Sequence, residues 1–164
     1  MVIWIIGKSG SGKSYLGKFL ENKLKKKFKK VYWLDGDKFR KKYSKDLGYS
    51  IKDRKRNSKR IQEHCKNKEK SKNIVICSIL SIFLKHQKNN RKIFNKYFQI
   101  YIEAKNNVLK KRNNKKIYDI KNNVVGKNIK FSRPYRSNII IKNKFNHEFL
   151  KKAEKILDKI IAKL

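Results

Sequence analysis

The stretch VIWIIGKSGSGKS, residues 2–14, decides how this chain folds. It begins with an apolar run, Val2–Ile6, and continues into residues that fit the pattern G-x-x-x-x-G-K-[ST]. Apolar residues then recur at helical spacing from Lys13 to Phe28, so a helix should follow the glycines. A buried strand, a glycine-rich turn and a helix in this order predict a phosphate-binding loop. An ordinary glycine turn would leave the complete motif and its context unexplained.

The residue types in this loop suit a triphosphate. Glycines allow the backbone to curl so that several N–H groups point at one phosphate. The start of the helix adds the positive end of its dipole. We expect Lys13 to reach the β- and γ-phosphates, and the Ser14 hydroxyl to ligate Mg²⁺, a cation that prefers oxygen. The sequence thus predicts a site for ATP and Mg²⁺ made of Gly7, Lys8, Ser9, Gly10, Ser11, Gly12, Lys13 and Ser14.

Short apolar runs and helical stretches alternate along the rest of the chain. The pattern predicts further strands at Val31–Leu34, Asn73–Ile79, Tyr97–Ile102 and Asn138–Ile141, and helices at Asp53–Lys70 and from Phe149 to Leu164. Strands that alternate with helices need crossover connections, which lead to a parallel sheet. The 164 residues suit one domain of ordinary size. We therefore predict an α/β fold, a P-loop NTPase-type three-layer sandwich over residues 1–164 with a five-stranded, mainly parallel sheet flanked by helices.

One long segment lacks such a pattern. Residues 113–136 are polar and basic, show little periodicity, and contain Pro134, the only proline of the chain. Loops of this length inside a compact domain are usually functional or disordered. We expect residues 113–136 to form a mobile lid over the phosphate site.

The net charge is high, because 47 Lys and Arg residues stand against 12 Asp and Glu residues, which gives +35. Such a charge attracts polyanions, so nucleic-acid binding is one interpretation. The other interpretation is compositional drift, since Lys, Asn and Ile are all abundant and share A/T-rich codons. The lysines are also spread along the whole chain. We therefore expect no nucleic-acid partner, and we keep a basic nucleic-acid-binding P-loop protein as the alternative of another class.

Cysteine and hydropathy patterns point to the cytoplasm. Cys65 and Cys77 form no CxxC pair, and the three histidines lack zinc-ligand spacing, so a reduced thiol pair is the default expectation. His64 and Cys65 fall within a predicted helix and should pack rather than bind metal. The apolar start is too short for a signal peptide or a membrane span, and no membrane association is expected.

Asp35 and Asp37 follow the second predicted strand. In an open parallel sheet, ligands bind beyond the carboxyl ends of the strands, so both acids should face the phosphate loop. One carboxylate can orient an acceptor hydroxyl, and the other can take its proton or hold Mg²⁺ through water. The alternative is a turn in which an Asp caps a helix. Further along, Arg40, Arg54 and Asn57 either bind phosphate or sulfate oxygens or form a solvated helix face.

Taken together, these residues resemble the adenylylsulfate kinase family. The shared order and spacing cover the phosphate loop, Leu34–Asp37, Arg40, Asp46–Ser50, Asp53, Arg54, Asn57, Arg112, Lys115, Tyr118, Asn123–Gly126 and Pro134. Residues 123–126 and Pro134 look like the family's lid. The resemblance extends over nearly the whole chain, to about Ile141, and the combination is far more specific than any single motif.

The resemblance implies an ATP-dependent transfer of phosphate to the ribose 3′-hydroxyl of adenylyl sulfate, by a protein that can form a homodimer. By this carry-over Asp37 is the base or a Mg²⁺ ligand, and Asp35 orients the acceptor. Lys115 reaches over the transferred phosphate, Arg112 lies near the ATP base, and Tyr49 stacks on the acceptor base. The residues that the resemblance assigns to the acceptor are Asp35, Arg40, Tyr49, Arg54, Asn57, Lys115, Val125 and Gly126.

Several positions depart from the family's pattern. Asn113 and Asn128 stand where the family has Asp, with Lys127 beside the second of these positions. Val124 stands where many members have a phenylalanine, so one of two rings around the acceptor purine is lost. That loss would cost about 1–3 kcal/mol for a flat base. The sequence is also similar to kinases of surface-polysaccharide pathways, including cytidine diphosphoramidate kinases, so a cytidine nucleotide is the alternative acceptor.

Overall fold

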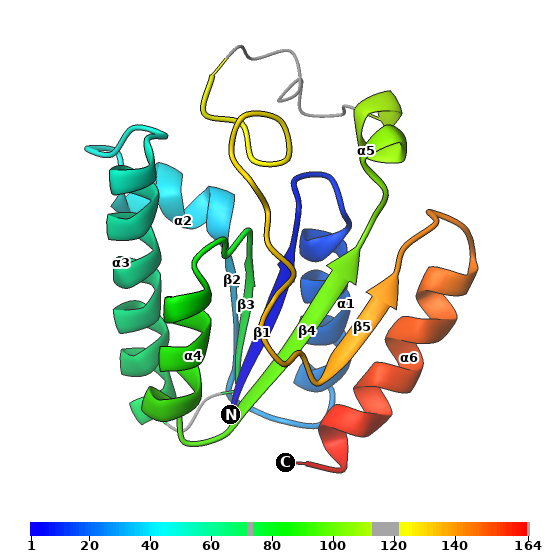
Figure 1. The fold of residues 1–164 in the computed structure, drawn as a ribbon. Helices are drawn as coiled ribbons and strands as arrows, with labels where there is room; N and C mark the ends of the chain where they lie inside the picture. Colours follow the sequence, from blue (N-terminus) through cyan, green and yellow to red (C-terminus); the bar gives the residue numbers. More distant parts are fainter. Residues whose placement is uncertain (72–73, 113–121, 164) are drawn as a thin grey trace.

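The computed structural model describes residues 1–71, 74–112 and 122–163, and it shows one five-stranded sheet with helices on both faces (Figure 1). The strands are β1 Val2–Gly7, β2 Val31–Asp35, β3 Ile74–Ile79, β4 Tyr97–Glu103 and β5 Ile139–Lys142. The helices are α1 Lys13–Lys25, α2 Gly36–Tyr43, α3 Ile51–Lys70, α4 Leu84–Ile93, α5 Asn106–Arg112 and α6 Glu148–Ile161. The strand order is β2-β3-β1-β4-β5, and every pairing is parallel.

The sheet is buried on both faces, which explains why β1 reads as an unbroken apolar run. Successive side chains of a strand point to opposite faces. Ile3 and Ile5 therefore pack with α1 and α6, while Trp4 and Ile6 pack on the other face with α3. The predicted α/β fold is confirmed, and the central strands lie where the sequence places them.

The structure corrects the boundaries of several predicted elements and adds three helices. The first helix ends at Lys25 instead of Phe28, the helix predicted from Asp53 begins at Ile51, and the last helix ends at Ile161. Helices α2, α4 and α5 were not predicted, because they are short and α4 has no apolar stripe. The buried side chains of α4 are Gln87 and Asn90, and they are held by hydrogen bonds rather than by apolar packing.

Both cysteines and His64 are packed in the fold as structural residues. Both thiols are free and fully buried, Cys65 on α3 and Cys77 on β3, and burial raises the pKa of the Cys77 thiol well above its ordinary value. His64 packs against the rings of Phe39 and Tyr43. Within the described ranges, no cluster of three or more His, Cys, Asp or Glu side chains suits a metal ion. The helices of the same ranges are all too short or too polar to cross a membrane.

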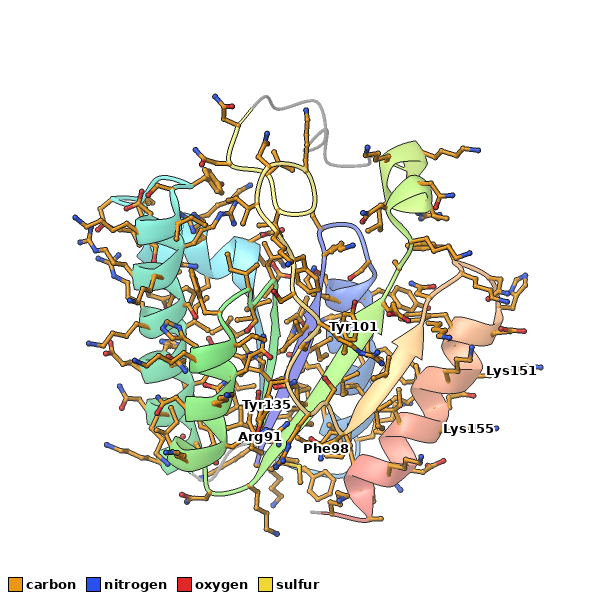
Figure 2. All side chains as sticks on the ribbon, in the orientation of Figure 1. Arg91, Phe98, Tyr101, Tyr135, Lys151 and Lys155 are labelled. Carbon is orange, nitrogen blue, oxygen red and sulfur yellow. The ribbon has the colours of Figure 1, made fainter. Side chains whose placement is uncertain are left out.

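The described part of the expected lid begins with a compact turn at residues 124–129. Residues 122–136 follow the part of that segment that lies outside the described residues. Val124 and Val125 are buried, and Val125 forms a bridge with Ile129. This turn lies above the C-terminal end of the sheet, next to the phosphate loop (Figure 1). The chain then runs down along the sheet to Tyr135, which lies beside Arg91 and accepts a hydrogen bond from Gln99 on β4 (Figure 2). Whether the expected lid opens and closes stays a prediction.

Candidate active site

A cavity of about 1320 Å³ lies at the C-terminal ends of the strands and brings most of the predicted site residues together. Its wall includes Ser9, Gly10, Gly12, Lys13, Ser14, Asp35, Asp37, Arg40, Tyr49, Arg54, Asn57, Arg112 and Val125. Open parallel sheets bind ligands at this edge. The acidic pair and the glycine loop therefore share one cavity.

The glycine loop adopts the conformation that its sequence predicts. Gly10 and Gly12 have φ values of 76° and 101°, a region that side chains with a Cβ rarely enter. Gly7 is needed for a different reason, because a Cβ there would lie 2.5 Å from Ser11 Oγ and 2.8 Å from the Ile102 carbonyl oxygen. The Lys13 ammonium donates to the Lys8 carbonyl at 2.7 Å, so it lies across the loop.

Asp35 caps a helix and also contacts the phosphate loop. Its Oδ1 accepts hydrogen bonds from the backbone N–H groups of Asp37 and Lys38, so it caps α2. Its Oδ2 accepts a hydrogen bond of 2.5 Å from the Ser14 hydroxyl. A single carboxylate thus links the start of α1 to the start of α2. This link fixes the position of Asp37, which lies in the first turn of α2 and lines the cavity.

The same residues fit a magnesium ion. Mg²⁺ usually takes one or two protein oxygens together with water and substrate phosphates. The Ser14 hydroxyl and the carboxylate of Asp37 are oxygen donors on one cavity wall beside the glycine loop. Asp35 bonds directly to the Ser14 hydroxyl and can orient it. A phosphate-bridged Mg²⁺ needs no larger cluster of acids than this.

Two arginines surround Tyr49 at the other end of the cavity. Arg40 donates to the carbonyls of Leu47 and Gly48, and its guanidinium carbon lies 4.4 Å from the centre of the Tyr49 ring. The guanidinium carbon of Arg54 lies 5.4 Å from the same ring centre. Tyr49 keeps 60% of its surface exposed. The ring is therefore held in place by cations while it remains accessible to a ligand.

Arg54 also joins two segments that are distant in sequence. Its Nε donates to the Tyr49 carbonyl at 3.0 Å, and its Nη2 donates to the Asn123 carbonyl at 2.7 Å. Burial, and next the charge of Arg40, lower the pKa of Arg54 from its ordinary value. An anion near these two guanidiniums would relieve that repulsion. One turn further along α3, the side-chain oxygen of Asn57 is buried without a hydrogen-bond partner and can accept one from a ligand.

Not every predicted site residue reaches the cavity. Lys8 points elsewhere, since its ammonium donates to Asn106 Oδ1 and lies 5.7 Å from the centre of the Phe131 ring. Ser11 is fully buried behind the loop. Gly126 has a φ of 90° and lies beside the Lys8 side chain. Lys115 lies outside the described residues.

The structure adds wall residues that sequence reasoning missed. Phe83 follows β3 and lines the cavity, with its ring centre 5.3 Å from that of His86. Asn143 and Phe145 follow β5 and line the end of the cavity opposite Tyr49. Their position directly after a predicted strand was a usable signal, because the same reasoning identified Asp35 and Asp37 after β2. Arg112 lies at this end too, with its guanidinium carbon 4.2 Å from the centre of the Phe145 ring.

Comparisons with known proteins agree with this geometry. The sequence profile of the family described as adenylylsulphate kinase matches residues 1–142. An adenylyl-sulfate kinase of Clostridium acetobutylicum is 34% identical over 99% of this chain and 82% of its own. A cytidine diphosphoramidate kinase of Campylobacter jejuni is 33% identical over 97% of this chain and 95% of its own.

Solved structures agree on the fold. The Mycobacterium tuberculosis APS kinase CysC in complex with AMPPNP and APS has a TM-score of 0.86 to this chain at 24% identity, covering 96% of this chain and 95% of that one. The profile match includes the phosphate loop, the acidic pair and the arginines around Tyr49. The resemblance inferred from the sequence is thereby confirmed, and the chain belongs to the adenylylsulphate kinase family.

Proposed function

We propose that the protein is an ATP-dependent kinase that transfers the γ-phosphate to the ribose 3′-hydroxyl of a small nucleotide, with adenylyl sulfate as the first candidate. One observation carries the proposal: the glycine loop and the acidic pair Asp35 and Asp37 line the same cavity as an arginine-rich pocket around Tyr49. The loop suits a triphosphate, and the arginines suit the anionic end of an acceptor. Asp35 contacts Ser14 of the loop, and Asp37 lies on α2, the helix that carries Arg40.

The proposed mechanism relies on positioning. Phosphoryl transfer has a loose transition state, so alignment of the acceptor hydroxyl with the γ-phosphate matters more than base strength. Backbone N–H groups of the glycine loop hold the phosphates, and Lys13 offsets the charge that develops between the β- and γ-phosphates. Asp35 orients the 3′-hydroxyl, and Asp37 accepts its proton. Bound Mg²⁺, held through Ser14 and Asp37, would add further charge stabilisation.

A cytidine nucleotide is the second candidate acceptor, and Val124 favours it. Val124 is 3% exposed and lines the cavity, so this position of the wall is aliphatic. A purine held on one side by Tyr49 alone would lose one stacking face, whereas a smaller pyrimidine depends less on a second ring. The relative that acts on cytidine diphosphoramidate matches almost the full length of both chains. Both acceptors are consistent with the same reaction at the 3′-hydroxyl.

A coupled ADP-release assay decides between these acceptors. Adenylyl sulfate and cytidine diphosphoramidate are compared side by side at equal concentrations, with Lys13→Ala as the blank. The proposal predicts ADP release with at least one acceptor and none with its 3′-deoxy analogue. Equal ADP release from the normal and the 3′-deoxy acceptor would show that water or another hydroxyl is the true acceptor, and would contradict the proposal.

A further inference from the structure

The loop between β5 and α6 is tied to the glycine loop by one side chain, that of Asn143. Its Nδ2 donates to the Ser11 carbonyl at 2.9 Å, and its Oδ1 accepts a hydrogen bond of 2.7 Å from the backbone N–H of Phe145. The residue is 6% exposed, and its own N–H donates to the Glu103 carbonyl at 2.8 Å. Both halves of the buried amide are therefore used, one on each loop.

The hydrogen bond between Asn143 and Ser11 lies next to Gly12, the residue of the glycine loop that directly precedes α1. A Cβ placed on Gly12 would lie 2.9 Å from Asn143 Nδ2, so the amide packs directly against the backbone there. The connection joins positions 132 residues apart in the sequence. Since the backbone of the glycine loop is expected to hold the phosphates, Asn143 relates their position to that of the β5–α6 loop.

Phe145 is the residue that this link presents to the cavity. Its φ of 61° is unusual for a residue with a side chain, and the hydrogen bond from its N–H to Asn143 supports that conformation. The guanidinium carbon of Arg112 lies 4.2 Å from the centre of the Phe145 ring, so the two side chains form a cation–ring pair at this end of the cavity. Figure 1 shows α5, which carries Arg112, and the β5–α6 loop on the same side of the glycine loop. Aromatic rings and arginine planes are surfaces on which a nucleobase stacks.

We propose that Phe145 supplies the stacking ring for the base of the donor nucleotide, and that Asn143 is the positioning residue that sets the distance between this base and the phosphates. The inference rests on the proposed function in one respect, that the donor is a nucleoside triphosphate. It assigns a role to two residues that neither the phosphate-loop motif nor the acidic pair includes. It also predicts that the two residues act on base binding and not on phosphate binding.

The test compares two ligands that differ by the nucleoside. Dissociation constants for ADP and for inorganic pyrophosphate are measured by calorimetry on wild type, Phe145→Leu and Asn143→Leu, with Lys144→Ala as a control in the same loop. Phe145→Leu should weaken ADP binding about tenfold, the order expected for one stacking ring, and leave pyrophosphate binding unchanged. Asn143→Leu should weaken ADP binding by a similar factor and pyrophosphate binding much less. Lys144→Ala should resemble wild type for both ligands.

The double variant tests whether Asn143 acts through Phe145. If it does, Asn143→Leu combined with Phe145→Leu should bind ADP about as well as either single variant, because effects on one shared interaction do not add. Independent effects that add, or an equal loss of ADP and pyrophosphate affinity, would overturn the positioning role. Unchanged ADP affinity in Phe145→Leu would overturn the stacking role, even if Asn143→Leu fails to fold. A wild-type protein that binds neither ligand would instead overturn the proposed function.

Discussion

The two ends of the cavity are built in different ways. At the donor end, the phosphate site consists of backbone: glycines with positive φ, the start of α1 and main-chain carbonyls contacted by Lys13 and Asn143. At the acceptor end, the wall consists of long side chains, and the guanidiniums of Arg40 and Arg54 hold the Tyr49 ring. A backbone site recognises any phosphate, whereas a side-chain site can change its ligand by substitution. From this difference we infer that the donor end determines the type of reaction, and that the acceptor end determines which acceptor binds.

The largest expected effect comes from removing Lys13. Lys13→Ala should abolish turnover, a loss of about 10³-fold or more, because it removes the charge beside the β- and γ-phosphates. Steady-state ADP release measures this, with Lys23→Ala on the exposed side of α1 as the control. Near-wild-type rates in Lys13→Ala would contradict the difference between the two ends, because the donor end would then not hold the phosphates.

A substitution of Asp37 tests the residue that is proposed to act on the acceptor hydroxyl between the two ends. Asp37→Asn is nearly isosteric and should lower kcat by about 10²–10⁴-fold if the carboxylate accepts the proton of the hydroxyl. The same variant should change KM for either substrate much less. A change in KM alone would instead make Asp37 a binding residue and leave the base unidentified.

Tyr49 sharpens the comparison at the acceptor end. Tyr49→Leu should raise KM for the acceptor about tenfold and leave KM for ATP unchanged, because it removes a base-stacking ring that only the acceptor contacts. Tyr49→Phe keeps the ring and is the matched control. A parallel rise in both KM values would show that the two ends are not independent.

The smallest expected effect concerns stability. Arg60 binds both carboxylate oxygens of Asp46 at 2.6 and 2.8 Å and lowers the pKa of that carboxyl from 3.8 to about 2. Since the folded pKa is depressed, the ion pair stabilises the fold fully above the unfolded pKa near 3.8, and the effect disappears as pH falls through about 2. Asp46→Asn should lower Tm by about 3 °C or less at pH 6, because the pair is exposed.

Urea unfolding of wild type and Asp46→Asn at a series of pH values tests this assignment. The difference between their midpoints should shrink from pH 5 toward pH 2. A difference that is constant with pH would mean that the substitution acts through packing and not through charge. This pair lies outside the cavity, so neither KM value should change.

The sequence was sufficient for the parts of the molecule that depend on backbone and apolar patterning. The glycine motif predicted the loop, and apolar runs predicted all five strands within one or two residues. Helix α4 could not be predicted, because its inner side is formed by Gln87 and Asn90, which look like surface residues in a sequence. Asn143 and Phe145 could have been suspected from their position after β5, but the contact of Asn143 with Ser11 is one that only the folded chain creates.

The alkylation rate of the two buried cysteines can measure how often this protein opens locally. Alkylating reagents attack the thiolate, and the core between α3 and β3 both excludes such reagents from Cys65 and Cys77 and keeps the Cys77 proton in place. Under native conditions, label can enter only when α3 separates from the sheet. The rate of alkylation, followed by mass spectrometry, therefore reports how often the acceptor half of the molecule opens, and added nucleotide should slow it if the bound ligand holds α3 in place.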